Sequence, residues 1–221
     1  MYKETVNRIL SSIIIIPIAL FFIIKGSFFF TFFLAICFLI SSLEWYKMSQ
    51  KKSYLIPGFL FLIISFYFTY LLRNAEKDSL TIFFVVITIC IATDIGGYVF
   101  GKIFKGPKLT KISPNKTYSG MLGGYFFSII FFNILINSTQ FLKSINIQIH
   151  YKIDFTPSIL TFILLISTVS QIGDLIISYF KRISKIKNTG KIIPGHGGLL
   201  DRIDGMIFAL PFCYLLTLVF Q

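Results

Sequence analysis

The sequence predicts an all-α, polytopic membrane protein with about seven transmembrane helices and a cytoplasmic N-terminus. Hydrophobic residues make up 55% of the 221 residues, charged residues make up only 14%, and the mean hydropathy is +0.81. A soluble domain of this size would lack the polar residues needed to cover its surface. Apolar stretches of about 16 to 20 residues, the length that a bilayer core requires, recur along nearly the whole chain and leave no room for a separate soluble domain.

The N-terminal part of the chain, residues 1–93, is expected to hold four of these helices. The first stretch follows a basic start, as in a signal peptide. It has no small-residue cleavage site and a second stretch follows at once, so we expect it to be retained. The second stretch ends in Glu44-Trp45-Tyr46-Lys47, an aromatic and basic boundary typical of the headgroup region. The four expected spans are residues 9–24, 28–43, 54–72 and 80–93.

The rest of the chain, residues 94–221, is expected to form a catalytic membrane region with two basic cytoplasmic loops. The first loop is polar and covers residues 101–120. The second contains the basic run 181–191, and a glycine-rich segment, 194–205, follows it. The three expected spans of this region are residues 121–136, 159–177 and 203–220.

The distribution of basic residues predicts the orientation. With the N-terminus inside, 16 of the 21 lysines and arginines lie in segments on the cytoplasmic side. Cytoplasmic loops of membrane proteins carry this excess of positive charge. Because seven is an odd number of spans, the C-terminus is expected on the opposite side.

Acidic residues gather at span ends on the same side. Five of the nine are found there: Glu44, Asp94, Asp174, Asp201 and Asp204. A carboxylate near the hydrocarbon boundary costs a few kcal/mol, so it is normally paired, faces a wet cavity or holds a cation. For Glu44 we expect an interfacial ion pair, and for the aspartates we expect a functional site.

The aspartates and the basic run together suit chemistry on phosphates. Asp174, Asp201 and Asp204 can supply oxygen ligands to Mg²⁺, which takes one or two carboxylates together with substrate phosphates. Arginines and lysines can bind a polyphosphate, and the glycines at positions 195, 197 and 198 can bring backbone amides close to an anion. This combination at a lipid interface predicts phosphoryl or nucleotidyl transfer involving a lipid.

Structural roles stay open as alternatives for the same residues. Asp201 and Asp204 also suit a helix N-terminus, and Asp174 can form a salt bridge with Lys181 or Arg182, about two turns further on. Two other classes of protein are also alternatives. A transporter would normally bury acids near the bilayer midplane, and a membrane scaffold would explain the polybasic loops through anionic lipids.

A long pattern of fixed spacing links these residues to a known family. It comprises Ser178, Lys181-Arg182, Lys187, Pro194-Gly195-His196-Gly197-Gly198 and Asp201-Arg202-Ile203-Asp204. Two further stretches agree, namely Asp94 with Tyr98, Gly101 and Lys102, and Ser113-Pro114-Asn115-Lys116-Thr117. The pattern resembles the signature of the phosphatidate cytidylyltransferase family, also called CDP-diacylglycerol synthase. Three positions depart from the family's usual residues: Asn188 for aspartate, Ser119 for glutamate and Gly205 for serine.

The resemblance implies a Mg²⁺-dependent reaction of CTP with phosphatidate that gives CDP-diacylglycerol and pyrophosphate for phospholipid biosynthesis. The catalytic residues implied are Asp174, Asp201, Asp204, Lys181, Arg182 and Arg202, and the three aspartates are also the implied metal ligands. The substrate-binding residues implied are Asp94, Ser113, Lys116, Thr117, His196, Gly197 and Gly198. For His196, a general-acid role, a pyrophosphate contact and a role in shaping the turn all stay open.

The resemblance also implies where the protein acts and with what. The expected partners are CTP, phosphatidate and membrane lipids, with no nucleic acid and with a homodimer as a candidate assembly. The expected location is the cell inner membrane, with the active site facing the cytoplasm. The nearest alternative enzyme is a CTP-dependent polyprenol kinase.

Overall fold

The computed structural model describes residues 2–75, 79–110, 112–144, 157–193, 195 and 197–219. Within these ranges the regular elements are helices, and two isolated β-bridges join Lys108 to Thr117 and Ile193 to Gly197. The prediction of an all-α fold is therefore confirmed. The helices are α1 (Tyr2–Lys25), α2 (Ser27–Ser49), α3 (Leu55–Asn74), α4 (Ser79–Phe104), α5 (Tyr118–Ser144), α6 (Pro157–Ile183), α7 (Leu200–Ile203) and α8 (Met206–Val219).

Five helices in the described part of the chain are long and apolar enough to cross a membrane. They are α2, α3, α4, α6 and, in α5, the segment Tyr118–Asn137. Two shorter apolar helices cover Ser11–Lys25 and Met206–Val219. A multi-pass membrane protein is therefore confirmed. The total of seven spans, the orientation of the N-terminus and the division of the chain at residue 93 stay predictions.

Helix α4 is longer than the apolar pattern predicted. The expected span ended at residue 93, but the helix continues to Phe104 because glycines let it pack directly on α5. A Cβ atom on Gly96 would lie 2.7 Å from Cβ of Phe127 and closer still to the carbonyl oxygen of Gly123. Asp94, which was expected to close this span, therefore lies inside a helix, about three turns before its end.

The expected last span, 203–220, is interrupted near its start. Helix α7 ends at Ile203 and α8 begins at Met206, so Asp204 and Gly205 lie between two helices. The N–H of Gly205 donates a 3.0 Å hydrogen bond to Oδ1 of Asp204. A Cβ atom on Gly205 would lie 3.0 Å from the carbonyl oxygen of Ser170, so this junction packs tightly on α6. Asp204 is thereby held just before the apolar helix α8.

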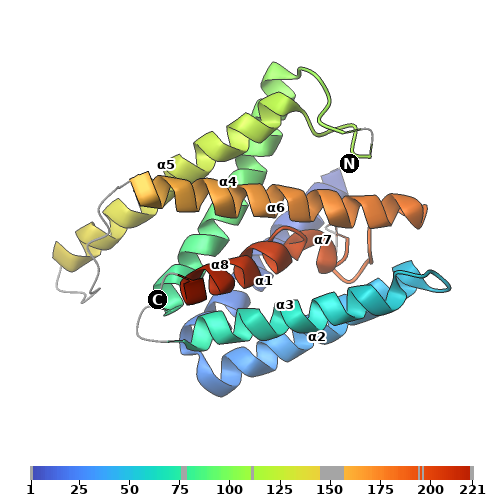
Figure 1. The fold of residues 1–221 in the computed structure, drawn as a ribbon, viewed down its shortest axis with the longest axis horizontal. Coiled ribbons are helices and arrows are strands. Elements are labelled where there is room, and N and C mark those ends of the chain that lie inside the picture. The colour runs from blue at the N-terminus through green and yellow to red at the C-terminus, as the bar shows by residue number, and fades with distance from the viewer. Residues whose placement is uncertain are drawn as a thin grey trace.

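The helices bring the polar connections to one end of the molecule. In Figure 1, α2 and α3 run antiparallel at the bottom of the view, and α8 packs against both α3 and α6. The α2–α3 turn, the α4–α5 connection and the segment between α6 and α7 all lie toward the right-hand end, and the C-terminus lies at the opposite end (Figure 1). The two basic loops therefore lie at one end, as the topology prediction requires.

Two clusters of buried apolar side chains hold this arrangement. In the first, Val86 and Ile89 of α4 belong to the same cluster as Ile163 and Ile166 of α6. The second joins α2, α3, α6, α7 and α8, and its buried members are Trp45, Met48, Leu62, Phe66, Ile177, Leu200 and Ile207. Because Leu200 belongs to α7, the second cluster fixes α7 against α2 and α3.

Candidate active site

A polar cavity of about 430 Å³ lies where the α4–α5 connection meets α4, α6 and α7. The three aspartates predicted as metal ligands, Asp174, Asp201 and Asp204, all line it, and so does Asp94 of α4. The other charged residues in the lining are Lys116, Lys181 and Arg202. Asp94 thus lines the same cavity as three aspartates that lie 80 to 110 positions later in the chain.

Two lysines pair with the carboxylates. Lys116 forms an ion pair with Oδ2 of Asp174, whereas Nζ of Lys181 lies 2.9 Å from Oδ1 of Asp201 and 3.8 Å from Oδ2 of Asp204. Lys181 is only 8% exposed, so its ammonium group is held in place by these carboxylates and not by water. The alternative of a salt bridge from Asp174 to Lys181 or Arg182 is not what forms, since Asp174 pairs with Lys116 and accepts a 3.2 Å hydrogen bond from Ser178.

The cavity carries more negative than positive charge. Its lining has four carboxylates against three cationic groups. Burial raises the pKa of Asp204 well above its usual range, the nearby carboxylate of Asp174 raises it further, and Lys181 opposes the rise. Among the described residues, no three His, Cys, Asp or Glu side chains converge closely enough to hold a metal ion by themselves.

Asp201 organises the glycine-rich segment as well as lining the cavity. Its Oδ2 accepts hydrogen bonds from the backbone N–H groups of Thr189 at 2.8 Å and Gly198 at 3.1 Å. The N–H of Gly197 donates to the carbonyl oxygen of Ile193 at 3.2 Å. The amides of Gly197 and Gly198, predicted to approach an anion, are therefore engaged within the protein in this conformation. The left-handed φ of +90° at Gly197 explains why glycine suits that position.

The Ser-Pro-x-Lys-Thr stretch contributes to the site in three ways. Lys116 and Thr117 line the cavity, and Thr117 also caps α5 because its Oγ1 accepts a 3.1 Å hydrogen bond from the N–H of Gly120. Ser113 does not line the cavity; its carbonyl oxygen accepts the N–H of Lys116 at 3.0 Å and so closes the turn that presents Lys116. Ser119 hydrogen-bonds to Thr117 and to the carbonyl oxygen of Lys105.

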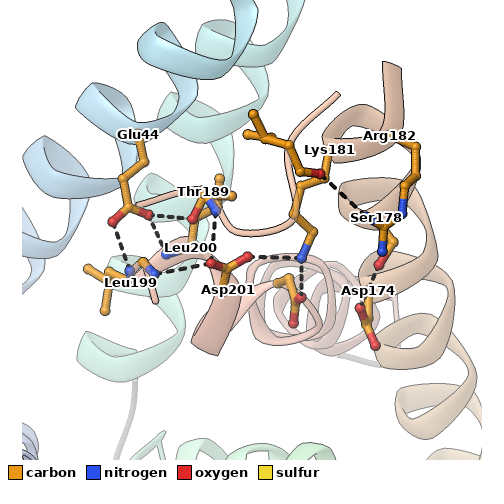
Figure 2. A network of polar contacts seen from close by, with 12 residues as sticks. Glu44, Asp174, Ser178, Lys181, Arg182, Thr189, Leu199, Leu200 and Asp201 are labelled. Atoms are coloured by element: carbon orange, nitrogen blue, oxygen red, sulfur yellow. Dashed lines mark hydrogen bonds and ion pairs between the residues drawn. The ribbon is translucent and has the colours of Figure 1, made fainter. Parts of the chain in front are cut away.

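The remaining predicted residues differ in placement. Arg202 lines the cavity, whereas Arg182 is exposed, is not part of the lining and donates a 3.4 Å hydrogen bond to the carbonyl oxygen of Ile186. The prediction for His196 lies outside the described residues. Figure 2 shows Lys181 directed toward Asp201 and the neighbouring Arg182 on another side of α6.

Sequence reasoning missed the role of Glu44. We expected it in an interfacial ion pair, but its described partners are neutral donors at 2.8 to 2.9 Å: the hydroxyl of Thr189 and the backbone N–H groups of Leu199 and Leu200. Figure 2 shows its carboxylate pointing from α2 toward Thr189, Leu199 and Leu200. The available signal was an acidic residue at the end of an apolar span, which does not reveal a partner about 150 residues away in the sequence.

The cavity and the helices around it indicate a broad class of protein. A polar cavity lined by carboxylates and cationic side chains, among helices long and apolar enough to cross a membrane, is the kind of site expected of a membrane-embedded enzyme. The chain belongs to the cytidylyltransferase family, whose model matches residues 6–76 and 55–220. The resemblance inferred from the motifs is thereby confirmed.

Individual relatives match along most of the chain. The phosphatidate cytidylyltransferase of Rickettsia felis is 32% identical over 96% of this chain and 92% of its own length. The Rickettsia bellii protein of the same name is 33% identical over 95% of this chain and 89% of its own length. The Bacillus subtilis phosphatidate cytidylyltransferase is 36% identical over 68% of this chain and 52% of its own length.

Proposed function

We propose that this protein transfers CMP from CTP to phosphatidate, giving CDP-diacylglycerol and pyrophosphate for phospholipid biosynthesis. The observation that carries the proposal is the convergence of four aspartates, two lysines and Arg202 in one cavity at an end of a multi-pass helical fold. Family membership and the names of the relatives support the same activity.

The chemistry needs charge neutralisation more than a strong base. A phosphate oxygen of phosphatidate attacks the α-phosphorus of CTP, the bond from that phosphorus to the bridging oxygen of the β-phosphate breaks, and pyrophosphate leaves with that oxygen. The attacking oxygen is already anionic at neutral pH, so the main barrier is the approach of two polyanions. Lys116, Lys181 and Arg202 reduce it by placing positive charge along the phosphates and by holding them in line.

A divalent cation fits the composition of the lining. Because carboxylates outnumber cationic groups in the lining, the cavity would repel a nucleoside triphosphate unless a cation added positive charge. Mg²⁺ is usually held by one or two carboxylates with phosphates and water, so it does not require a complete protein cage. We assign Asp174 and Asp204 as ligands, and Asp201 as the third carboxylate of the set, which holds Lys181. When bound, Mg²⁺ supplies positive charge to the reacting phosphates.

The proposal places the site at the cytoplasmic face of the inner membrane. The excess of basic residues on the predicted inner side supports this orientation, because CTP is supplied from the cytosol. The exposed apolar side chains of the spanning helices would contact membrane lipids. A homodimer stays part of the proposal, and chemical cross-linking of the protein in native membranes would test it.

The decisive experiment follows the phosphate that is transferred. Purified protein in detergent is incubated with Mg²⁺, phosphatidate and CTP labelled at the α-phosphate, and the label is expected in a lipid product with pyrophosphate released in equal amount. The Asp174→Asn variant is expected to lose activity by about 100-fold or more. Asp154→Asn, which changes an aspartate outside every matched motif, is the control and should retain activity. A parallel incubation uses CTP labelled at the γ-phosphate and a polyprenol as acceptor. Label in the polyprenol there, with no lipid product from α-labelled CTP, would favour a lipid kinase and refute the proposal.

A further inference from the structure

Glu44 is a buried carboxylate in α2, a largely apolar helix that is long enough to cross a membrane. It is 2% exposed and lies near the C-terminal end of α2. Burial of a carboxylate is costly unless hydrogen bonds satisfy it. Oε1 accepts the N–H of Leu199 at 2.9 Å, and Oε2 accepts the N–H of Leu200 at 2.8 Å and the hydroxyl of Thr189 at 2.9 Å (Figure 2). All three donors belong to the segment that leads into Asp201.

The segment is built around this carboxylate. A Cβ atom on Gly190 would lie 2.7 Å from Oε1 of Glu44, and a Cβ atom on Gly198 would lie 2.5 Å from Oε2. Both glycines therefore leave the space that the carboxylate fills. Gly198 thus suits its position by packing against Glu44, as well as by donating its N–H to Asp201.

Thr189 connects Glu44 to the residues that line the cavity. Its hydroxyl donates to Glu44 and its backbone N–H donates to Oδ2 of Asp201, whose Oδ1 binds Lys181. Lys181 in turn lies 3.8 Å from Asp204. A continuous series of polar contacts therefore runs from α2 through the glycine-rich segment to the cavity (Figure 2). Neither Glu44 nor Thr189 lines the cavity itself.

We propose that Glu44 is a positioning residue: it anchors Thr189, Leu199 and Leu200 to α2 and thereby sets Asp201 and Lys181 for the reaction. This inference rests on the proposed function for its kinetic consequence, but the anchoring itself can be measured without activity. The N-terminal helices then serve catalysis directly, because they carry the anchor for residues that lie more than 130 positions later in the sequence.

The first test removes the anchor without changing its size. In Glu44→Gln, an NH₂ group replaces one of two oxygens that together accept three hydrogen bonds, so at least one donor loses its acceptor. We expect kcat to fall by about 10- to 100-fold, with a much smaller change in the KM for CTP. Ser41→Ala is the matched control. It changes a buried polar residue on the same helix whose hydroxyl has no hydrogen-bond partner among the described residues, so it should keep wild-type kcat.

The second test separates positioning from general stability. Thr189→Val should lower kcat, whereas Thr189→Ser, which keeps the hydroxyl, should keep kcat close to the wild-type value. The double variant Glu44→Gln/Thr189→Val should lose less activity than the product of the two single losses. Hydrogen exchange supplies a readout that does not depend on activity: Glu44→Gln should speed exchange in peptides covering 189–200 and leave the α4–α5 peptides unchanged.

The outcomes separate the two proposals. If wild-type protein forms no CDP-diacylglycerol, the proposed function fails, and the exchange data still decide whether Glu44 anchors the segment. If wild-type protein is active but Glu44→Gln keeps wild-type kcat and exchange, the inference is overturned and the function stands. Equal losses in Thr189→Ser and Thr189→Val would also overturn it, because the hydroxyl would then have no role.

Discussion

Adjacent glycines on α4 allow a sharp test of how closely α4 and α5 pack. In Gly96→Ala the new methyl group would overlap the carbonyl oxygen of Gly123 and lie 2.7 Å from Cβ of Phe127, so the two helices must separate. In Gly97→Ala the nearest atom, the carbonyl oxygen of Gly120, lies 3.7 Å away, which is ordinary contact. The two variants make the same chemical change one residue apart in the same helix.

The magnitudes follow from the two environments. Overpacking costs about 1–3 kcal/mol, and replacing a helical glycine by alanine returns up to about 1 kcal/mol. Because the gain from alanine is the same in both variants, Gly96→Ala should be less stable than Gly97→Ala by about 1–3 kcal/mol, which corresponds to a Tm lower by about 2–12 °C. Gly97→Ala should keep or slightly raise the Tm. Because α4 carries Asp94 and α5 follows Lys116, the separation in Gly96→Ala should also lower activity.

The measurement is thermal unfolding of both purified variants in detergent, followed by the fluorescence of Trp45, the single tryptophan. Wild-type protein and Gly97→Ala are the references for Gly96→Ala. An equal Tm for the two variants would refute the direct backbone contact between α4 and α5.

Three further predictions concern the site and its loop. Lys181→Met should lower kcat by about 100-fold or more because it leaves Asp201 and Asp204 without their shared cation, whereas the exposed Arg182→Met should cost less than about tenfold; both are read in the CTP assay. Asp204→Asn should raise the Mg²⁺ concentration needed for half-maximal activity, and an unchanged Mg²⁺ requirement would exclude Asp204 as a ligand. Thr117→Val removes the cap of α5 and should lower stability by about 1 kcal/mol in thermal unfolding, while Thr117→Ser keeps the hydroxyl and the stability.

Some features of the site could be predicted because they depend on residue type and local spacing. A carboxylate at the end of an apolar span is costly wherever the chain goes, so Asp174, Asp201 and Asp204 could be assigned to one site before any contact was known. The structure brings these aspartates to one cavity. Lys116 could be predicted from its motif, Ser113-Pro114-Asn115-Lys116-Thr117.

Other features depend on the direction of a side chain, which composition does not report. Lys181 and Arg182 were predicted together, but successive residues on a helix point about 100° apart, so Lys181 reaches Asp201 while Arg182 is exposed. Ser113 matched its motif but shapes a turn behind Lys116. Hydropathy likewise marks the apolar part of α4 but not the end of the helix, which glycine packing extends to Phe104.

The sequence by itself determined the all-α membrane fold, the family and the acidic and basic residues of the site, because hydropathy and motif spacing are properties of the chain. Only the tertiary structure decided that Glu44 binds the segment before Asp201 and that Lys181 joins Asp201 to Asp204. The physical reason is that a buried polar group must find partners wherever packing brings them, and packing joins residues that are far apart in the sequence.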